Sequence, residues 1–143
     1  MIYTPLTKKA MRIAFEAHKN QFDKSGIPYI YHPIHLAEQM NDEVTTCVAL
    51  LHDVVEDTDI TFDDLEQAGF TAEIIGALKL LTHDVTVPYM DYVAAIKSNP
   101  IAKVVKLADL AHNSDNTRLD VMDEKALKRV EKYKQAIAVL QTF

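Results

Sequence analysis

The segment DEVTTCVALLHDVVED, residues 42–57, decides how this chain is expected to fold. Its apolar side chains recur at the spacing of an α-helix and form one broad stripe, which comprises Val44, Cys47, Val48, Leu50, Leu51, Val54 and Val55. A helix that is apolar nearly all round is normally buried. We therefore expect residues 42–56 to form one continuous helix that passes through the middle of the domain.

Four ionisable side chains stand at the end of this predicted helix: His52, Asp53, Glu56 and Asp57. Acidic residues are unfavourable at a helix C-terminus, where the helix dipole is negative, and an unpaired buried charge costs several kcal/mol. A divalent cation would hold the acids together, and a neutral His52 would suit it as a nitrogen ligand. The alternative is a solvated helix end with one histidine in the core, so this segment alone leaves both interpretations open.

Helical periodicity continues through the rest of the chain and is divided by proline, glycine and capping residues. The expected helices cover residues 5–20, 33–40, 61–69, 71–82, 88–98, 100–113 and 123–141, and a loop covers 22–33. No segment alternates convincingly between apolar and polar residues, as a half-buried strand would. With 143 residues, the chain is expected to form a single domain over residues 1–143, an all-α compact multi-helix bundle.

The composition excludes several classes of function. A formal net charge of −6 argues against non-specific binding to DNA or RNA, although it permits a phosphate-bearing small molecule held by a metal and a few local cations. No apolar run approaches the about 20 residues of a membrane span, and the N-terminal segment lacks the apolar core of a signal peptide. The single cysteine, Cys47, lies among apolar residues, which favours a buried structural thiol over a nucleophile. We expect a cytoplasmic protein with no nucleic-acid or membrane partner.

A second apolar helix, within VVKLADLAHNSDNTR (residues 104–118), is interrupted by Asp109. A carboxylate inside so apolar a helix needs a partner, and a shared metal would supply one. The alternative is a simple hydrogen bond to Lys106 or His112.

His32, in PYIYHP (residues 28–33), stands where a loop is expected to meet a helix. Alone, such a histidine is most often a hydrogen-bonded polar residue without further function. Together with His52, Asp53 and Asp109, it completes a set of two histidines and two carboxylates. Nitrogen and carboxylate ligands suit Mn, Fe or Zn better than Ca.

The dipeptide His-Asp also occurs at residues 83–84, in THDV (82–85). It falls at the end of a predicted helix, with solvent-like neighbours and no further acids in the adjoining sequence. We therefore interpret His83 as a histidine that interacts favourably with a helix C-terminus, outside the predicted site.

The ordered combination of His32, His52-Asp53 and Asp109 resembles the pattern of the HD-domain metal-dependent phosphohydrolases. Within that superfamily the chain is most similar to the hydrolase domain of RelA/SpoT-type alarmone enzymes and to their small stand-alone relatives, including the metazoan SpoT homologues. The similar stretches have the same order and spacing and span most of the chain: AHKNQFDKSGIPYIYHP (17–33), ALLHDVVEDT (49–58) and VKLADLAHNSDNTR (105–118).

The resemblance implies a site with three groups of residues. These are the metal ligands His32, His52, Asp53 and Asp109, the catalytic residues Glu56 and Asp57, and the nucleotide contacts Lys24, Ser25 and Asn113. The implied metal is Mn²⁺, although Fe or Zn fits the same ligand set. The implied reaction is hydrolysis of the 3′-pyrophosphate of guanosine tetra- or pentaphosphate to GDP or GTP and pyrophosphate. Synthesis of the alarmone requires a second domain in that family, for which we expect no room here.

Two acidic residues depart from the family pattern: Asp23 and Asp115 stand where better-known members usually carry basic residues near the nucleotide. This difference favours a second interpretation, in which the same chemistry acts on another nucleotide, such as a nucleoside mono- or triphosphate or NADPH. The basic residues available to compensate are Lys19, Lys106 and Arg118. A third interpretation is a non-catalytic nucleotide-binding module, which would not need the water-activating pair of Glu56 and Asp57.

Overall fold

The computed structural model describes residues 1–142, and within that range all regular secondary structure is helical. The elements are α1 (Pro5–His18), α2 (Tyr31–Glu38), α3 (Glu43–Leu51), α4 (Val54–Asp57), α5 (Phe62–Gln67), α6 (Ala72–Leu81), α7 (Tyr89–Ile96), α8 (Pro100–Asn113), the 3₁₀ helix η1 (Asn116–Arg118) and α9 (Glu124–Gln141). The predicted all-α class is confirmed. Over the same residues, no helix combines the length and apolar character that crossing a membrane requires.

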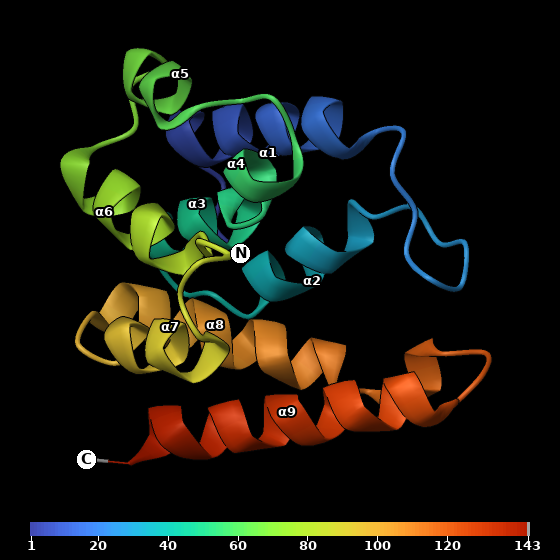
Figure 1. Ribbon diagram of the computed structural model, residues 1–143. Coiled ribbons are helices and arrows are strands. Elements are labelled where there is room, and N and C mark those ends of the chain that lie inside the picture. Colours follow the sequence, from blue (N-terminus) through green and yellow to red (C-terminus); the bar gives the residue numbers. More distant parts are fainter. Residues whose placement is uncertain (143) are drawn as a thin grey trace.

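Helix α3 forms the centre of the bundle. It packs against α1, α2, α6 and α8, while α8 in turn packs against α9 (Figure 1). Each residue from Thr45 to Leu51 is buried, so this helix has no solvent-facing side along most of its length. The apolar pattern therefore predicted its central position correctly.

The predicted continuous helix over residues 42–56 is wrong, because the chain breaks between α3 and α4. Helix α3 ends at Leu51, and Asp53 has φ −105° and ψ 0°, which depart from the angles of a regular α-helix, about −63° and −42°. The His52 ring provides a local cause: its Nδ1 lies 2.7 Å from the carbonyl oxygen of Ala49, which a continuous helix would offer to the backbone N–H of Asp53. This break sets the directions in which the side chains of His52 and Asp53 point.

Most other helix boundaries follow local capping chemistry. Thr4 and Thr61 each form a reciprocal capping box, with Thr7 and Asp64 respectively, at the starts of α1 and α5. Two predicted starts are displaced: Pro88 precedes α7 as its N-cap residue, and α2 begins two residues before Pro33. Residues 19–30, between α1 and α2, form a loop that contacts η1, where the Ser25 hydroxyl donates to the Arg118 carbonyl oxygen.

Candidate metal centre

Two histidines and two aspartates from distant parts of the sequence meet in the interior. His32 comes from α2, His52 and Asp53 from the break between α3 and α4, and Asp109 from α8. One potential ligand atom from each residue lies within 4.8 Å of all the others. The Nε2 atom of His32 is 2.9 Å from Asp109 Oδ1, and the Nε2 atom of His52 is 2.9 Å from Asp53 Oδ2. The structure thus brings together all four residues predicted as metal ligands.

The environment of His52 matches that of a ligand to a cation. Its Nδ1 donates to the Ala49 carbonyl oxygen, which leaves the lone pair on Nε2. Nε2 is buried and has no hydrogen-bond partner within residues 1–142, although Asp53 Oδ2 and Asp109 Oδ1 lie 2.9 and 3.4 Å away. A buried lone pair facing two carboxylates is repulsive unless a proton or a cation lies between them. The donor set therefore fits a divalent metal.

The pKa values in the cluster show the same electrostatic pattern. Burial opposes a charge on His52, but the carboxylates of Asp53 and Asp109 overcome this effect and raise the pKa of His52 well above its usual value. Burial likewise opposes the charge of Asp109, but Lys106 and the two histidines hold the pKa of its carboxyl well below the usual range. The carboxylates therefore favour a positive charge at His52, and a bound cation would take the place of that charge.

Three further side chains hold the carboxylates in place. The Tyr29 hydroxyl donates to Asp53 Oδ2 at 2.5 Å, and the Asn113 amide donates to Asp109 Oδ1 at 3.1 Å. Lys106 Nζ lies 2.9 Å from Asp109 Oδ2. The hydrogen bond between Lys106 and Asp109 that the sequence analysis considered therefore exists, at Oδ2 of Asp109. The other oxygen, Oδ1, faces the histidines. Such outer contacts orient metal ligands, and sequence analysis did not identify Tyr29.

His32 is oriented from behind by a second histidine. Its Nδ1 lies 2.7 Å from Nδ1 of His112, so one ring must donate and the other accept. Burial and then the nearby Arg118 charge lower the pKa of His112 to about 4, which favours a neutral ring that accepts the hydrogen bond. His112 thus contacts His32, rather than Asp109 as one sequence interpretation allowed.

Glu56 and Asp57 lie beside the cluster and line a cavity of about 210 Å³ together with Asp53 and Asp109. Glu56 Oε1 accepts the backbone N–H of His83 at 2.8 Å. Burial, followed by the charges of Asp53 and Glu56, raises the pKa of Asp57 to about 6. The cavity therefore has an acidic wall next to the candidate ligands.

His83 lies closer to the site than its neighbours in sequence indicated. Its backbone contacts Glu56, and its ring stacks on Tyr92 with centroids 4.5 Å apart, at the edge of the same cavity. The sequence separation of 27 residues from Glu56 concealed this contact. His83 nonetheless lies outside the four-residue cluster.

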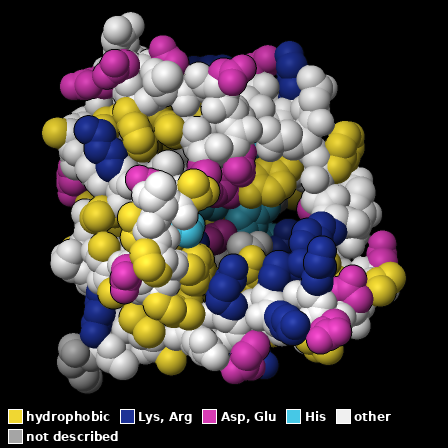
Figure 2. Space-filling model, in the orientation of Figure 1, with side chains coloured by type: hydrophobic (Ala, Val, Ile, Leu, Met, Phe, Trp, Pro, Cys, Tyr) yellow, Lys and Arg dark blue, Asp and Glu magenta, His cyan; other side chains and the backbone are white. Residues whose placement is uncertain are grey.

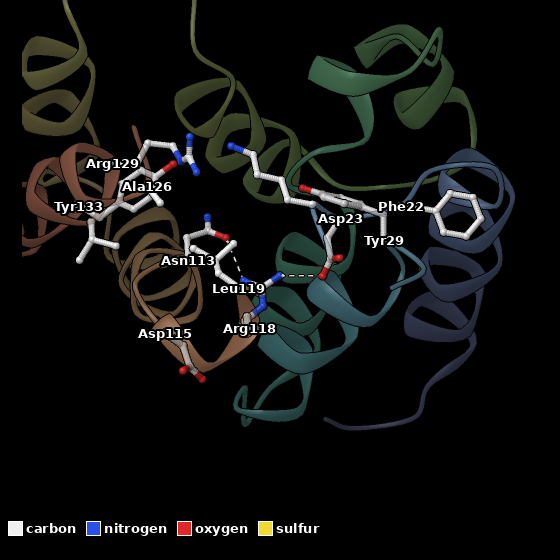
Figure 3. A pocket seen from close by; sticks show the side chains of 12 residues that line it. Phe22, Asp23, Tyr29, Asn113, Asp115, Arg118, Leu119, Ala126, Arg129 and Tyr133 are labelled. Carbon is white, nitrogen blue, oxygen red and sulfur yellow. Dashed lines mark hydrogen bonds and ion pairs between the residues drawn. The ribbon is translucent and has the colours of Figure 1, made fainter. Parts of the chain in front are cut away.

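A second cavity, of about 360 Å³, adjoins the first (Figure 3). Tyr29, Asn113 and Tyr133 line both, so the two cavities share a wall. The second also contains Lys24, Arg118 and Arg129. Ser25 is not among its lining residues, because the Ser25 hydroxyl donates to the Arg118 carbonyl oxygen at 2.7 Å.

The two unexpected acids are largely engaged in local structure. Asp23 Oδ1 accepts the backbone N–H groups of Ser25 and Ile27 at 2.9 and 3.0 Å, and its Oδ2 lies 3.8 Å from Arg118 Nη2. Asp115 Oδ1 accepts both the N–H and the hydroxyl of Thr117, and its carboxylate points away from the other labelled side chains in Figure 3. Arg118 therefore offsets the charge of Asp23 at the second cavity.

The surface over the site divides by charge. Figure 2 shows histidine at the bottom of a hollow, acidic side chains along its upper edge and a group of lysines and arginines below it. Of the compensating residues considered from sequence, Arg118 and Lys106 line the two cavities, whereas Lys19 pairs with Glu16 elsewhere on the surface. The acidic side of the hollow suits a bound metal, and the basic side suits the phosphate groups of a ligand beside it.

No family model matches the chain, but its sequence is similar to those of several known proteins. Guanosine-3′,5′-bis(diphosphate) 3′-pyrophosphohydrolase MESH1 of Mus musculus is 40% identical over 114 residues, which are 69% of this chain and 63% of that protein. The protein of the same name from Danio rerio is 33% identical over 143 residues, 91% of this chain and 79% of that protein. The bifunctional (p)ppGpp synthase/hydrolase SpoT of Escherichia coli K12 is 35% identical over 74% of this chain but only 17% of its own length.

A solved structure shows the same fold. It is that of a metazoan orthologue of SpoT that hydrolyses ppGpp, with a TM-score of 0.80 and 25% sequence identity over 99% of this chain and 88% of that one. The match to mouse MESH1, by contrast, spans less than two thirds of that protein.

Proposed function

Since this chain belongs to the RelA/SpoT-type family of HD-domain hydrolases that includes MESH1 and SpoT, we propose that it is a metal-dependent phosphohydrolase. Its substrate would be guanosine tetra- or pentaphosphate, from which it would release pyrophosphate and leave GDP or GTP. One observation carries the proposal: the buried cluster of His32, His52, Asp53 and Asp109 opens into a cavity that also contains Glu56 and Asp57. We propose further that residues 1–143 act as one HD domain without synthetase activity.

We propose Mn²⁺ as the metal, held by those four residues. Two imidazole nitrogens and two carboxylates would also accept Fe or Zn, so the ligand set supports the class of metal more strongly than its identity. A bound divalent cation would make a water molecule acidic and offset the charge on phosphoryl oxygens. The protein's own part is to hold the ligands through Tyr29, Lys106 and His112.

Glu56 and Asp57 are proposed to move the protons. Glu56, fixed through Oε1 by the His83 N–H, would accept a proton from the attacking water. Water would add to the phosphorus bonded to the ribose 3′-oxygen, and the bond between that phosphorus and oxygen would break. Asp57, with its pKa raised to about 6, would give its proton to the departing 3′-oxygen. Pyrophosphate and a free 3′-hydroxyl result.

The second cavity is proposed to bind the rest of the nucleotide. Lys24, Arg118 and Arg129 would face the 5′-phosphates, and Asn113 lies where the two cavities join. Ser25 would act by tying the loop before α2 to the carbonyl of Arg118. A nucleotide fits this space better than a nucleic acid, because three basic residues line the cavity in a chain whose formal net charge is −6.

One observation favours another nucleotide as the substrate. The carboxylate of Asp23 lines the second cavity, where it reduces the positive charge that a 5′-diphosphate would meet. A substrate with fewer charges on that side, such as a nucleoside monophosphate or NADPH, would tolerate this acid better.

A nucleotide panel tests the proposal. The purified protein is incubated with Mn²⁺ and each nucleotide, and pyrophosphate and orthophosphate are measured separately. Pyrophosphate from guanosine tetraphosphate, absent with His52→Ala and retained with Asp84→Ala, is the expected result. Orthophosphate from other nucleotides would instead support the alternative substrate, and tight binding without turnover under every metal would indicate a binding module.

A further inference from the structure

Lys132, on α9, reaches the metal cavity without a carboxylate partner among residues 1–142. Its Nζ lies 4.5 Å from the centre of the Tyr89 ring and 5.4 Å from that of Tyr133. All three residues line the cavity that contains Glu56 and Asp57. Cation–π contacts with two rings hold the ammonium group at the wall without neutralising its charge.

The other lysine of this cavity is already engaged. Lys106 Nζ lies 2.9 Å from Asp109 Oδ2 and also faces the Tyr92 ring, at 5.3 Å from its centre. The Tyr92 hydroxyl is occupied as well, because it donates to the Leu81 carbonyl oxygen at 2.6 Å. The charge of Lys106 is therefore paired with a candidate metal ligand, whereas Lys132 has no carboxylate partner within residues 1–142.

Tyr89 supplies a second uncommitted group. Its hydroxyl is buried and has no hydrogen-bond partner within the described chain. Burial raises the pKa of Tyr89, so its hydroxyl stays protonated and is available as a donor. A buried donor without a partner is costly unless a ligand or water satisfies it.

A pyrophosphoryl substrate needs such groups in this place. Its first phosphoryl group would lie beside the metal, and its second would share the cavity with the acidic side chains of Glu56 and Asp57. Repulsion between that group and two carboxylates would disfavour binding. Lys132 and Tyr89 present a cation and a hydroxyl donor on the same cavity.

We propose that Lys132 and Tyr89 form a subsite for the second phosphoryl group of the leaving pyrophosphate, and that this subsite makes the enzyme prefer diphosphate esters over monophosphate esters. The preference for esters rests on the proposed function, whereas binding of inorganic pyrophosphate by the subsite does not.

Calorimetric binding of two inorganic probes tests the subsite directly. The protein is loaded with one equivalent of Mn²⁺, freed of excess metal, and titrated with pyrophosphate or orthophosphate. Lys132→Ala is expected to weaken pyrophosphate binding about tenfold and orthophosphate binding less than about twofold, an effect typical of one charge-assisted contact. Lys132→Arg should restore most of the loss, and Tyr89→Phe should reproduce part of it. Lys134→Ala, an exposed lysine two residues further along α9, is the matched control and should behave as the wild type.

Turnover supplies the second measurement. With guanosine tetraphosphate, Lys132→Ala should raise KM and change kcat little, while kcat/KM for the analogue with a single 3′-phosphate should stay unchanged. Equal losses for both probes, or no loss, would overturn the subsite. If no nucleotide releases pyrophosphate but the binding ratio still depends on Lys132, the proposed function fails and the subsite stands.

Discussion

At the scale of single residues, the candidate metal site depends on side chains other than the four candidate ligands. Tyr29 illustrates this dependence, because its hydroxyl fixes Asp53 Oδ2, the oxygen that also approaches His52. His52, Asp53 and Asp109 could be predicted because a histidine or acid inside an apolar helix is conspicuous in sequence, whereas His32 was predicted only in combination with them and through the family resemblance. Tyr29 and His112 could not be predicted, since a tyrosine in a loop and a histidine at a helix end are ordinary, and their partners lie 24 and 80 residues away.

Replacement of Tyr29 with Phe should weaken metal binding. The loss of one outer-shell hydrogen bond is expected to raise the Kd for Mn²⁺ about 10- to 100-fold. Calorimetric titration of metal-free protein measures it, with Tyr31→Phe as control, since Tyr31 is 60% exposed. An unchanged Kd in Tyr29→Phe would show that Asp53 does not need this contact.

Asp57 should make stability depend on pH. Its pKa rises from 3.8 to about 6 in the folded protein, so the folded state binds this proton more tightly than the unfolded state does. Ionisation of Asp57 therefore lowers stability as pH rises from about 4 through about 6. In Asp57→Asn this loss is absent, so the variant should gain Tm relative to the wild type at pH 7.5 and not at pH 4. Because Asp57 is exposed to solvent, the gain should be modest. A Tm difference independent of pH would contradict the raised pKa.

At the scale of elements, local chemistry predicted where helices start better than where they break. Thr4, Thr61 and Thr71 cap the helices that follow them, as residue types in the right order indicate. The break between α3 and α4 was not predicted, because the apolar periodicity continues through it. The His52 ring takes the Ala49 carbonyl oxygen from the backbone, and a hydrophobic pattern does not reveal such a contact. The break has a functional consequence: consecutive residues in a helix do not face each other, yet His52 Nε2 and Asp53 Oδ2 lie 2.9 Å apart.

Removal of the α5 cap should affect stability but not the site. Thr61 Oγ1 accepts the N–H of Asp64 at 3.1 Å, and the Asp64 carboxylate accepts the N–H of Thr61 at 2.9 Å. Thr61→Ala is expected to lower the free energy of unfolding by about 1 kcal/mol, measured by urea denaturation. Thr61→Ser keeps the oxygen and should lose little. The Kd for Mn²⁺ should be the same in all three proteins, and a change would mean that α5 is coupled to the metal centre.

At the scale of the whole molecule, the site joins segments that have no other reason to be close. His32, the His52–Asp53 break and Asp109 lie in α2, between α3 and α4, and in α8, and all of these helices pack on the central α3 or follow it directly. The order and spacing of these residues predicted that they converge, because acids buried on two apolar helices repel one another unless a shared cation offsets their charge. Lys24 and Asn113 of the adjoining cavity were predicted as nucleotide contacts, but the contribution of Arg129 was not, since it depends on how α9 folds back toward the loop before α2.

Metal binding should therefore stabilise the entire fold. A ligand that binds only the folded state contributes about 2.7 kcal/mol when its concentration is 100 times its Kd. For a chain of this size, that corresponds to a rise in Tm of about 5–10 °C. Differential scanning calorimetry with saturating Mn²⁺, compared with the same protein in chelator, should show this rise in the wild type and in Asp84→Ala, whose aspartate lies in the other His-Asp pair. His52→Ala should keep its helical circular dichroism and show no rise, because the variant lacks the buried Nε2 that has no hydrogen-bond partner within residues 1–142. An equal rise in His52→Ala would place the metal elsewhere, and the catalytic proposal would lose its foundation.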